Sequence, residues 1–299
     1  MAAAITIETP GVFDFAQIFD YLNRSANECL YEADAASVTR LMPAGGAPVL
    51  VRLSARADGA LTAECPALTE PPDDETLRAV AAYIREWFDM DRDLSGFLAL
   101  ASRDEVLAPA VRRFRGLRIV GIADLFEALC WGIMGQQINL AFAYTLKRRF
   151  VERYGDSVRW NGRVYWTFPA PERIAAIDPA ELRGLQFTGR KAEYVVGAAR
   201  LMAEGVLSKA GLLALPDWTA REKALTAIRG IGPWTAHYVL MRCLRNPGAF
   251  PLEDVGLHNA LKVALGREEK PPLAEIQALA APWGEWKAYA TFYLWRLLY

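Results

Sequence analysis

The feature that most constrains this fold is the near-continuous series of helical patterns after about residue 105. Apolar residues recur at spacings of three and four, and the segments are joined by connections of ordinary length. These segments are 125–134, 140–154, 170–177, 179–185, 191–204, 212–215, 221–229, 233–244, 256–265, 273–281 and 286–299. The aromatic stretch 160–168 is an exception and is expected to be extended. We therefore predict an all-α region over 106–299, arranged as two helical subdomains.

The first 105 residues carry strand patterns that become rare in the rest of the chain. Runs rich in β-branched residues predict strands at 5–9, 48–54 and 61–67. The last two can pair across a turn at Asp58-Gly59. Helical spacing is present at 13–22 and 76–88. The predicted fold class is α+β, with a small N-terminal antiparallel sheet and its helices over 1–105, followed by the all-α region.

Charge is distributed unevenly between these two regions. Residues 1–105 contain 8 Lys and Arg against 18 Asp and Glu, whereas residues 106–299 contain 26 against 17. The whole chain has a net charge of only −1. The basic second region favours a polyanionic partner for that region alone.

Several classes of protein are disfavoured by composition. Charges interrupt every apolar stretch before the roughly 18 residues that a membrane span requires. The N-terminus lacks the basic and then apolar order of a signal peptide, so we expect a cytoplasmic protein. Cys29, Cys65, Cys130 and Cys243 have no metal-ligand spacing, and only two histidines are present. These patterns predict inert thiols and neither a zinc site nor an iron–sulfur cluster.

The most informative motif is LTAIRGIGPWTAHYVLMRCL at 225–244. Gly230-Ile231-Gly232 separates two helical segments, and glycine permits positive φ angles and a close approach to another surface. Pro233 suits the first turn of the second helix. The N–H groups left free at that helix start can bind a phosphate. The same glycine pattern also joins ordinary packed helices, so the motif alone does not decide between these alternatives.

A second motif, FPLEDVG at 250–256, places two carboxylates directly before a predicted helix. Aspartate is a favoured N-cap residue, so Asp254 is interpretable as a purely structural cap. It is also interpretable as a functional carboxylate, an alternative that gains weight only in combination with the preceding hairpin. Its neighbour Glu253 is the rival candidate.

The two motifs in this order resemble the helix-hairpin-helix base-excision DNA glycosylases. Within that superfamily the chain is most similar to the 3-methyladenine DNA glycosylase II (AlkA-type) branch. Further matching segments are DLFE at 124–127, IMGQQ at 133–137 and WKAYATFYLW at 286–295. The resemblance covers roughly 105–299, and the order of an α/β domain before helical domains also matches.

The resemblance implies a glycosylase that flips alkylated bases out of double-stranded DNA and excises them, initiating base excision repair. Asp254 would then be the catalytic carboxylate, stabilising positive charge on the sugar and directing the attacking water. Trp234 stands where relatives that also cleave the strand carry a Schiff-base lysine. The resemblance therefore implies a monofunctional enzyme that leaves an abasic site.

The same resemblance assigns the substrate pocket and the DNA contacts. Trp234, Tyr238 and Trp295 would line an aromatic cleft for the base. The implied DNA-binding residues are Gly230, Ile231, Gly232, Thr235, Gln136 and Gln137. Gln137 falls at the position of the wedge that fills the vacated stack, although both glutamines are also compatible with a simple helix end. No cofactor is implied apart from a structural monovalent cation on the backbone carbonyls of Thr226, Ile228 and Ile231.

Three alternatives stay open at this stage. The first is a glycosylase for oxidised purines on the same fold, which Trp234 disfavours. The second is a non-catalytic helix-hairpin-helix DNA-binding protein, which would not need the Asp254 loop. The third is a helical scaffold without nucleic acid. Gly256 stands where many superfamily members have histidine, and Val255 replaces a larger neighbour, so the range of accepted bases is open.

Overall fold

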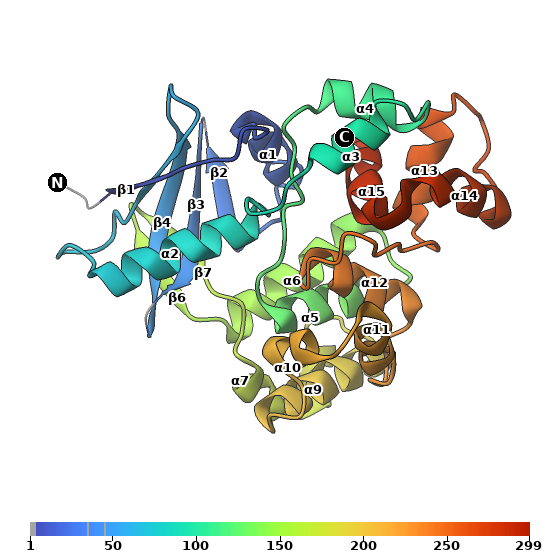
Figure 1. The fold of residues 1–299 in the computed structure, drawn as a ribbon. Coiled ribbons are helices and arrows are strands. Elements are labelled where there is room, and N and C mark those ends of the chain that lie inside the picture. The colour runs from blue at the N-terminus through green and yellow to red at the C-terminus, as the bar shows by residue number, and fades with distance from the viewer. Residues whose placement is uncertain (1–3, 35, 45) are drawn as a thin grey trace.

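The computed structural model describes residues 4–34, 36–44 and 46–299, and its N-terminal part is built on an antiparallel sheet (Figure 1). The strands are β1 (Ala4–Ile7), β2 (Tyr31–Asp34), β3 (Ser37–Ala44), β4 (Ala47–Ala55) and β5 (Leu61–Glu64). Their order in the sheet is β1-β5-β4-β3-β2. The predicted hairpin is confirmed, because Leu53 of β4 pairs with Ala63 of β5.

Two helices accompany this sheet, and both begin at an aspartate cap. α1 (Phe15–Leu22) follows Asp14, whose side chain accepts a hydrogen bond from the amide of Ala16. α2 (Asp74–Trp87) follows Asp73, whose side chain accepts from the amide of Thr76. The capping carboxylates satisfy amides that a helix leaves free at its start. α2 crosses the sheet and contacts β3 (Figure 1).

The predicted succession of helices is confirmed, with ends that differ by a few residues. The helices are α5 (Leu125–Gly135), α6 (Leu140–Tyr154), α7 (Pro171–Ala175), α8 (Pro179–Arg183), α9 (Gly189–Ala203), α10 (Lys209–Ala214), α11 (Trp218–Thr226), α12 (Pro233–Arg242), α13 (Val255–Ala264), α14 (Leu273–Ala280) and α15 (Lys287–Trp295). Short 3-10 segments follow α14 and α15. The extended stretch is a hairpin of β6 (Ser157–Trp160) and β7 (Arg163–Trp166). Its turn residues Asn161 and Gly162 both have positive φ.

Two further helices come before this series and were not predicted from the sequence. α3 (Ser95–Ala101) and α4 (Leu107–Arg113) lie beside the C-terminal helix α15 (Figure 1). α15 also contacts α13, while α5 contacts α6, α9 and α12 in the other group of helices. The boundary between domains at residue 105 stays a prediction.

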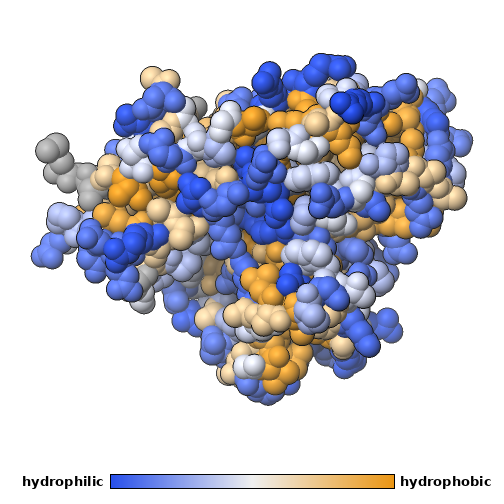
Figure 2. Space-filling view, viewed as in Figure 1, coloured by the Kyte–Doolittle hydropathy of each residue, from blue (hydrophilic) through white to orange (hydrophobic). Residues whose placement is uncertain are grey.

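The core runs without a break from the sheet through both groups of helices, from Ile7 and Leu53 to Phe126, Val239 and Trp283. Hydrophilic and hydrophobic residues are interspersed over the surface seen in Figure 2. Of the helices in the described part of the chain, none combines the length and apolar character needed to cross a membrane.

Candidate active site

The turn between α11 and α12 needs its first glycine for two reasons. Gly230 has a φ of +92°, which side-chain-bearing residues rarely adopt. A Cβ at Gly230 would also lie 2.2 Å from the ring of Tyr194, so the backbone packs directly on α9. Gly232 differs, since it caps α12 with a φ of −84° and a Cβ there would meet no atom within 4 Å.

The first backbone amides of α12 have no acceptor within the helix itself. The first bond within the helix is donated by the amide of Ala236 to the carbonyl of Gly232, at 2.9 Å. The amides of Trp234 and Thr235 precede that bond, and Pro233 has no N–H to offer. Together with the positive end of the helix dipole they suit a phosphate oxygen. Thr235 as a whole residue is only 1% exposed, whereas Trp234 is half-buried, so the amide of Trp234 belongs to the more accessible of the two residues.

The loop that follows α5 is tied to this hairpin. The side-chain amide of Gln136 donates to the carbonyl of Gly230 at 2.9 Å and to the hydroxyl of Thr235 at 3.2 Å. The ammonium of Lys191 donates to the carbonyl of Met134, which fastens the end of α5. Gln137 is exposed and has a φ of +56°. Gln136 thus holds the loop while Gln137 is presented outward on a strained backbone.

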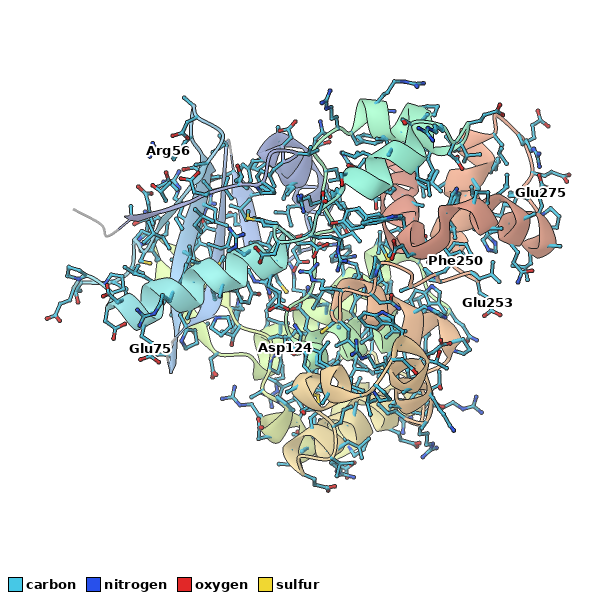
Figure 3. The ribbon with its side chains drawn as sticks, in the orientation of Figure 1. Arg56, Glu75, Asp124, Phe250, Glu253 and Glu275 are labelled. Carbon is cyan, nitrogen blue, oxygen red and sulfur yellow. The ribbon has the colours of Figure 1, made fainter. Side chains whose placement is uncertain are left out.

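Asp254 stands at the N-cap of α13 with both carboxylate oxygens engaged. Oδ1 accepts from the backbone amide of Leu257 at 2.6 Å and from the indole N–H of Trp295 at 2.8 Å. Oδ2 accepts from the indole N–H of Trp234 at 3.0 Å. Asp254 is half-buried, whereas its neighbour Glu253 is exposed at the edge of the molecule (Figure 3). The carboxylate that joins the aromatic residues is therefore that of Asp254.

The three aromatic residues singled out in the sequence form one cluster beside this carboxylate. The rings of Trp234 and Tyr238 stack with centroids 5.8 Å apart and planes 30° apart. The rings of Tyr238 and Trp295 are 6.5 Å apart at 34°. Trp234 is half-buried and the other two are buried. The cluster therefore has one partly open end, at Trp234.

Gly256 allows this arrangement. A Cβ at Gly256 would lie 2.8 Å from Oδ1 of Asp254 and 3.2 Å from the indole nitrogen of Trp295. A larger side chain would displace the indole or turn the carboxylate. Glycine at position 256, where many superfamily members have histidine, thus has a local steric reason.

Both histidines of the chain support the Asp254 loop, a role that the sequence did not suggest. Nδ1 of His237, on α12, accepts from the backbone amide of Phe250 at 3.2 Å. Nε2 of His258, on α13, is 2.7 Å from the carbonyl of Leu252. Because both partners are backbone atoms of a loop, residue types alone carry no signal for these contacts.

All four cysteines of the chain are free thiols. Cys65, Cys130 and Cys243 are buried and Cys29 is half-buried, all without disulfide bonds. Burial raises the pKa of Cys29 and of Cys243 to about 12, so both are protonated at neutral pH. In the part of the chain that the structure describes, no three His, Cys, Asp or Glu side chains gather to hold a metal.

Comparisons with known proteins agree with this geometry. Residues 130–285 match the family of HhH-GPD superfamily base excision DNA repair proteins, and residues 5–129 match the 8-oxoguanine DNA glycosylase N-terminal domain. The DNA-3-methyladenine glycosylase of Bacillus subtilis is 48% identical over 99% of this chain and 97% of its own length. DNA-3-methyladenine glycosylase 2 of Escherichia coli is 31% identical over 60% of each chain.

Solved structures share the fold over nearly the whole chain. A 3-methyladenine DNA-glycosylase from Archaeoglobus fulgidus superposes with a TM-score of 0.80 at 22% identity, covering 98% of this chain and 97% of its own. An 8-oxoguanine glycosylase/lyase from Clostridium acetobutylicum superposes with a TM-score of 0.75 at 18% identity, covering 98% and 96%. The family resemblance inferred from the motifs is confirmed, and the chain belongs to the HhH-GPD superfamily of base excision DNA repair proteins.

Proposed function

We propose that this protein is a monofunctional DNA glycosylase that excises alkylated bases of the 3-methyladenine type from double-stranded DNA. The observation that carries the proposal is the Asp254 carboxylate, held by two indole N–H groups beside the aromatic cluster. The 48% identity to a relative named DNA-3-methyladenine glycosylase supports the same substrate class. Base removal by this chain would initiate base excision repair.

Asp254 is the residue to which we assign the chemistry. When the N-glycosidic bond breaks, positive charge develops on the sugar, and a nearby fixed carboxylate stabilises it. The indoles of Trp234 and Trp295 fix the rotation of the carboxylate, and the amide of Leu257 fixes its position at the helix start. A carboxylate held in this way needs little reorganisation as the charge appears. It can also orient or deprotonate the attacking water.

Trp234, Tyr238 and Trp295 form the surface against which the extruded base would stack. Alkylation at a ring nitrogen makes a purine cationic, and an electron-rich aromatic face attracts a cation. A cationic base is also a good leaving group, since it departs uncharged. Stacking on the aromatic rings and the charge of Asp254 therefore suffice to bind and excise such bases.

The hairpin and the loop after α5 supply the DNA contacts in this proposal. Gly230, Ile231 and Gly232 bring the backbone close to the DNA, and the accessible amides at the start of α12 bind a phosphate of the damaged strand. The buried Thr235 acts in this interface by accepting the hydrogen bond of Gln136. Gln137 fills the space left in the stack, while Gln136 acts through its bonds to the hairpin. Damaged double-stranded DNA is thus the partner, and no membrane or obligate protein partner is invoked. The cytoplasmic location, with association to the nucleoid during repair, stays a prediction.

A monovalent cation fits the hairpin carbonyls chemically. The carbonyl of Ile228 accepts one hydrogen bond, from the amide of Ile231 at 3.0 Å, and an amide oxygen has a second lone pair. Together with the carbonyls of Thr226 and Ile231 it offers neutral oxygen ligands. Such an ion would brace the turn and a phosphate, and no chemical step depends on it.

Strand cleavage is not part of the proposed activity. A Schiff base requires an amine near the sugar. The side chain at position 234 is instead an indole, whose N–H donates a hydrogen bond to Asp254. Incubation with damaged DNA and borohydride should therefore give no covalent protein–DNA adduct. A strong adduct would contradict the monofunctional assignment.

The decisive experiment is to incubate the protein with alkylated duplex DNA and to measure the bases released. We expect Asp254→Asn to lower the rate by about 10²–10³ while duplex binding is retained. Glu253→Gln is the matched control, because it removes the neighbouring exposed carboxylate and should excise normally. Near-normal excision by Asp254→Asn would overturn the assignment.

The same assay tests the second candidate, a glycosylase for oxidised purines. The match of residues 5–129 to the 8-oxoguanine DNA glycosylase N-terminal domain favours including it. Release of 8-oxoguanine in preference to alkylated bases would favour that candidate. We expect the opposite preference.

A further inference from the structure

A cluster of charged side chains lines a pocket next to the aromatic cluster, and the proposed chemistry does not use these charges. Tyr238 lines this pocket, together with cationic and acidic side chains from the N-terminal part and from α5, α6 and α12. The open space inside is about 30 Å³. That is room for water, and not for a whole base.

The pocket holds more positive than negative charge. Its cations are Arg24, Arg40, Lys147 and Arg242, and its carboxylates are Glu28 and Glu127. Arg40 pairs with Glu127 at 3.2 Å, and Lys147 lies 3.1 Å from both carboxylates. Among the described residues, no carboxylate forms an ion pair with Arg24 or Arg242. Two guanidinium charges are therefore in surplus.

These two arginines differ in how many of their N–H groups already donate to an acceptor. Arg242 is buried and donates to the hydroxyl of Tyr238 at 3.1 Å and to the carbonyl of Val120 at 2.7 Å. Arg24 is half-buried and follows α1. It donates to the carbonyl of Tyr21 at 2.8 Å, and its guanidinium carbon lies 3.8 Å from the centre of the Tyr21 ring. A guanidinium has five N–H groups, so Arg24 keeps donors for a ligand.

The pocket adjoins the place where an extruded base would stack. Tyr238 belongs to both, because its ring stacks on Trp234 and its hydroxyl binds Arg242. α5 also connects them, since Trp131 lines the pocket and a Cβ at Gly135 would lie 3.7 Å from the ring of Trp234. A base placed beside the aromatic cluster would therefore adjoin the pocket that holds the surplus charge.

We propose that Arg24 is a specificity-determining residue that selects extruded bases by their charge. The inference rests on the proposed glycosylase function. A cationic alkylated base departs as a neutral molecule, and a positive charge at its edge opposes its binding. An uncharged damaged purine with a carbonyl edge departs as an anion, and the guanidinium stabilises both that edge and the departing charge. Arg24 thus extends the range of the enzyme to uncharged lesions.

The reaction balances without a further reactant. The bond between C1′ of the sugar and N9 of the purine breaks, and its electron pair remains on the purine. The oxygen of the attacking water bonds to C1′. The proton that the water loses is finally taken up by the purine anion after it departs. Arg24 contributes its charge and hydrogen bonds and transfers no proton, because its guanidinium stays protonated at neutral pH.

The test compares single-turnover excision from two duplexes that differ only in the lesion. One carries 7-methylguanine, which is cationic, and the other carries hypoxanthine, which is uncharged and has a carbonyl edge. We expect Arg24→Met to lower the hypoxanthine rate and to raise the 7-methylguanine rate. The ratio of the two rates should change by about tenfold, the order of magnitude expected for one unit charge acting through the protein at an effective dielectric of about 20.

Two further variants make the outcome decisive. Arg24→Lys keeps the charge and should retain most of the ratio. Arg153→Met is the matched control, because Arg153 is exposed and its guanidinium carbon lies 5.8 Å from the centre of the Tyr154 ring, outside the pocket. That variant should leave both rates unchanged.

The possible failures are distinguishable. If the wild type releases 7-methylguanine and no hypoxanthine, the charge selection is wrong and the glycosylase function stands. If Arg24→Met lowers both rates equally, Arg24 has only a structural role and the inference is overturned. If the wild type releases neither base, the inference falls together with the alkylated-base assignment.

Discussion

Replacing each glycine of the hairpin with alanine should separate folding from DNA binding. At Gly230 the backbone has a φ of +92°, and the new Cβ would stand 2.2 Å from the ring of Tyr194. A side chain in the left-handed region costs about 1–2 kcal/mol. Forcing a methyl group into a packed contact costs about 1–3 kcal/mol more. Gly230→Ala should therefore lower the free energy of unfolding by about 2–5 kcal/mol.

Gly232→Ala is the matched control for that substitution. Its φ of −84° suits alanine, and no atom lies within 4 Å of the new Cβ. A gain from reduced unfolded-state entropy, about 0.4–1 kcal/mol, offsets the poorer capping of alanine. Stability should thus change by less than about 1 kcal/mol. The methyl group would nevertheless stand in the open space at the turn, where the proposed function places a phosphate, so duplex affinity should fall by about tenfold or more.

Thermal unfolding and duplex-binding titrations of the two variants check this reasoning. Gly230→Ala should lower the unfolding midpoint by about 4–10 °C, and Gly232→Ala should leave it nearly unchanged. The double variant Gly230→Ala with Tyr194→Ala should lose less than the sum of the single changes, because the clash is removed. An unchanged midpoint for Gly230→Ala would refute the packing argument. Full duplex affinity in Gly232→Ala would refute the placement of the phosphate.

The remaining predictions concern the carboxylate, the wedge and the buried ion pairs. Trp295→Phe keeps an aromatic ring but removes a donor to Asp254, and a hydrogen bond to a charged group contributes about 1.5–3 kcal/mol, so single-turnover excision should fall by at least about tenfold with duplex affinity retained. Gln137→Ala should slow excision without lowering the unfolding midpoint, and unchanged excision would remove Gln137 from the wedge role. Lys147→Met leaves Glu28 and Glu127 without their shared cation and should cost about 3–5 kcal/mol in denaturant unfolding at neutral pH. Burial by itself would raise the pKa of Glu28. The ammonium of Lys147 and two backbone amides outweigh burial and hold that pKa below its ordinary value of 4.5. A carboxyl group whose pKa is lowered in the folded state stabilises the fold at pH values above 4.5. This stabilisation by Glu28 is lost as the pH falls through its lower, folded-state pKa. The loss of unfolding free energy caused by Lys147→Met should therefore become smaller in that acidic range.

Most helices were predictable because their signals are local, whereas α3 and α4 lack a side-chain cap and were missed. Asp73, Asn139 and Thr188 each accept a hydrogen bond from an amide in the first turn that follows, as N-cap residues do. The turn of the second hairpin was also encoded locally, in the Asn161-Gly162 pair. Such signals need no knowledge of the rest of the chain.

Strand β3 was missed because its stability is not local. Residues 37–42 are buried on both faces of the sheet, so the strand shows no alternation. The sequence there includes Arg40, which ordinarily predicts an exposed position. In the structure its guanidinium pairs with Glu127 of α5 and lies over the ring of Trp87. Only the fold supplies these partners.

The sequence singled out the residues of the candidate site but not the hydrogen bonds among them. The motifs brought Trp234, Tyr238, Asp254 and Trp295 to attention through family resemblance. The indole donors lie 20 and 41 residues away from Asp254, and no spacing rule connects them. The support that His237 and Gln136 give to the loops is likewise tertiary. The cationic pocket was also missed, since its members come from segments far apart along the chain.

The two interpretations of Asp254, helix cap and functional carboxylate, turn out to be compatible. Capping occupies one lone pair of Oδ1 with the amide of Leu257, and the cap fixes the carboxylate at the start of α13. A carboxylate has about four lone-pair sites, so the indoles of Trp234 and Trp295 bind without displacing the cap. One site is then left, on Oδ2, for a water molecule or for the charge on a sugar. A helix start therefore provides the rigidity that electrostatic catalysis needs, and a capping signal in the sequence is no argument against a catalytic role.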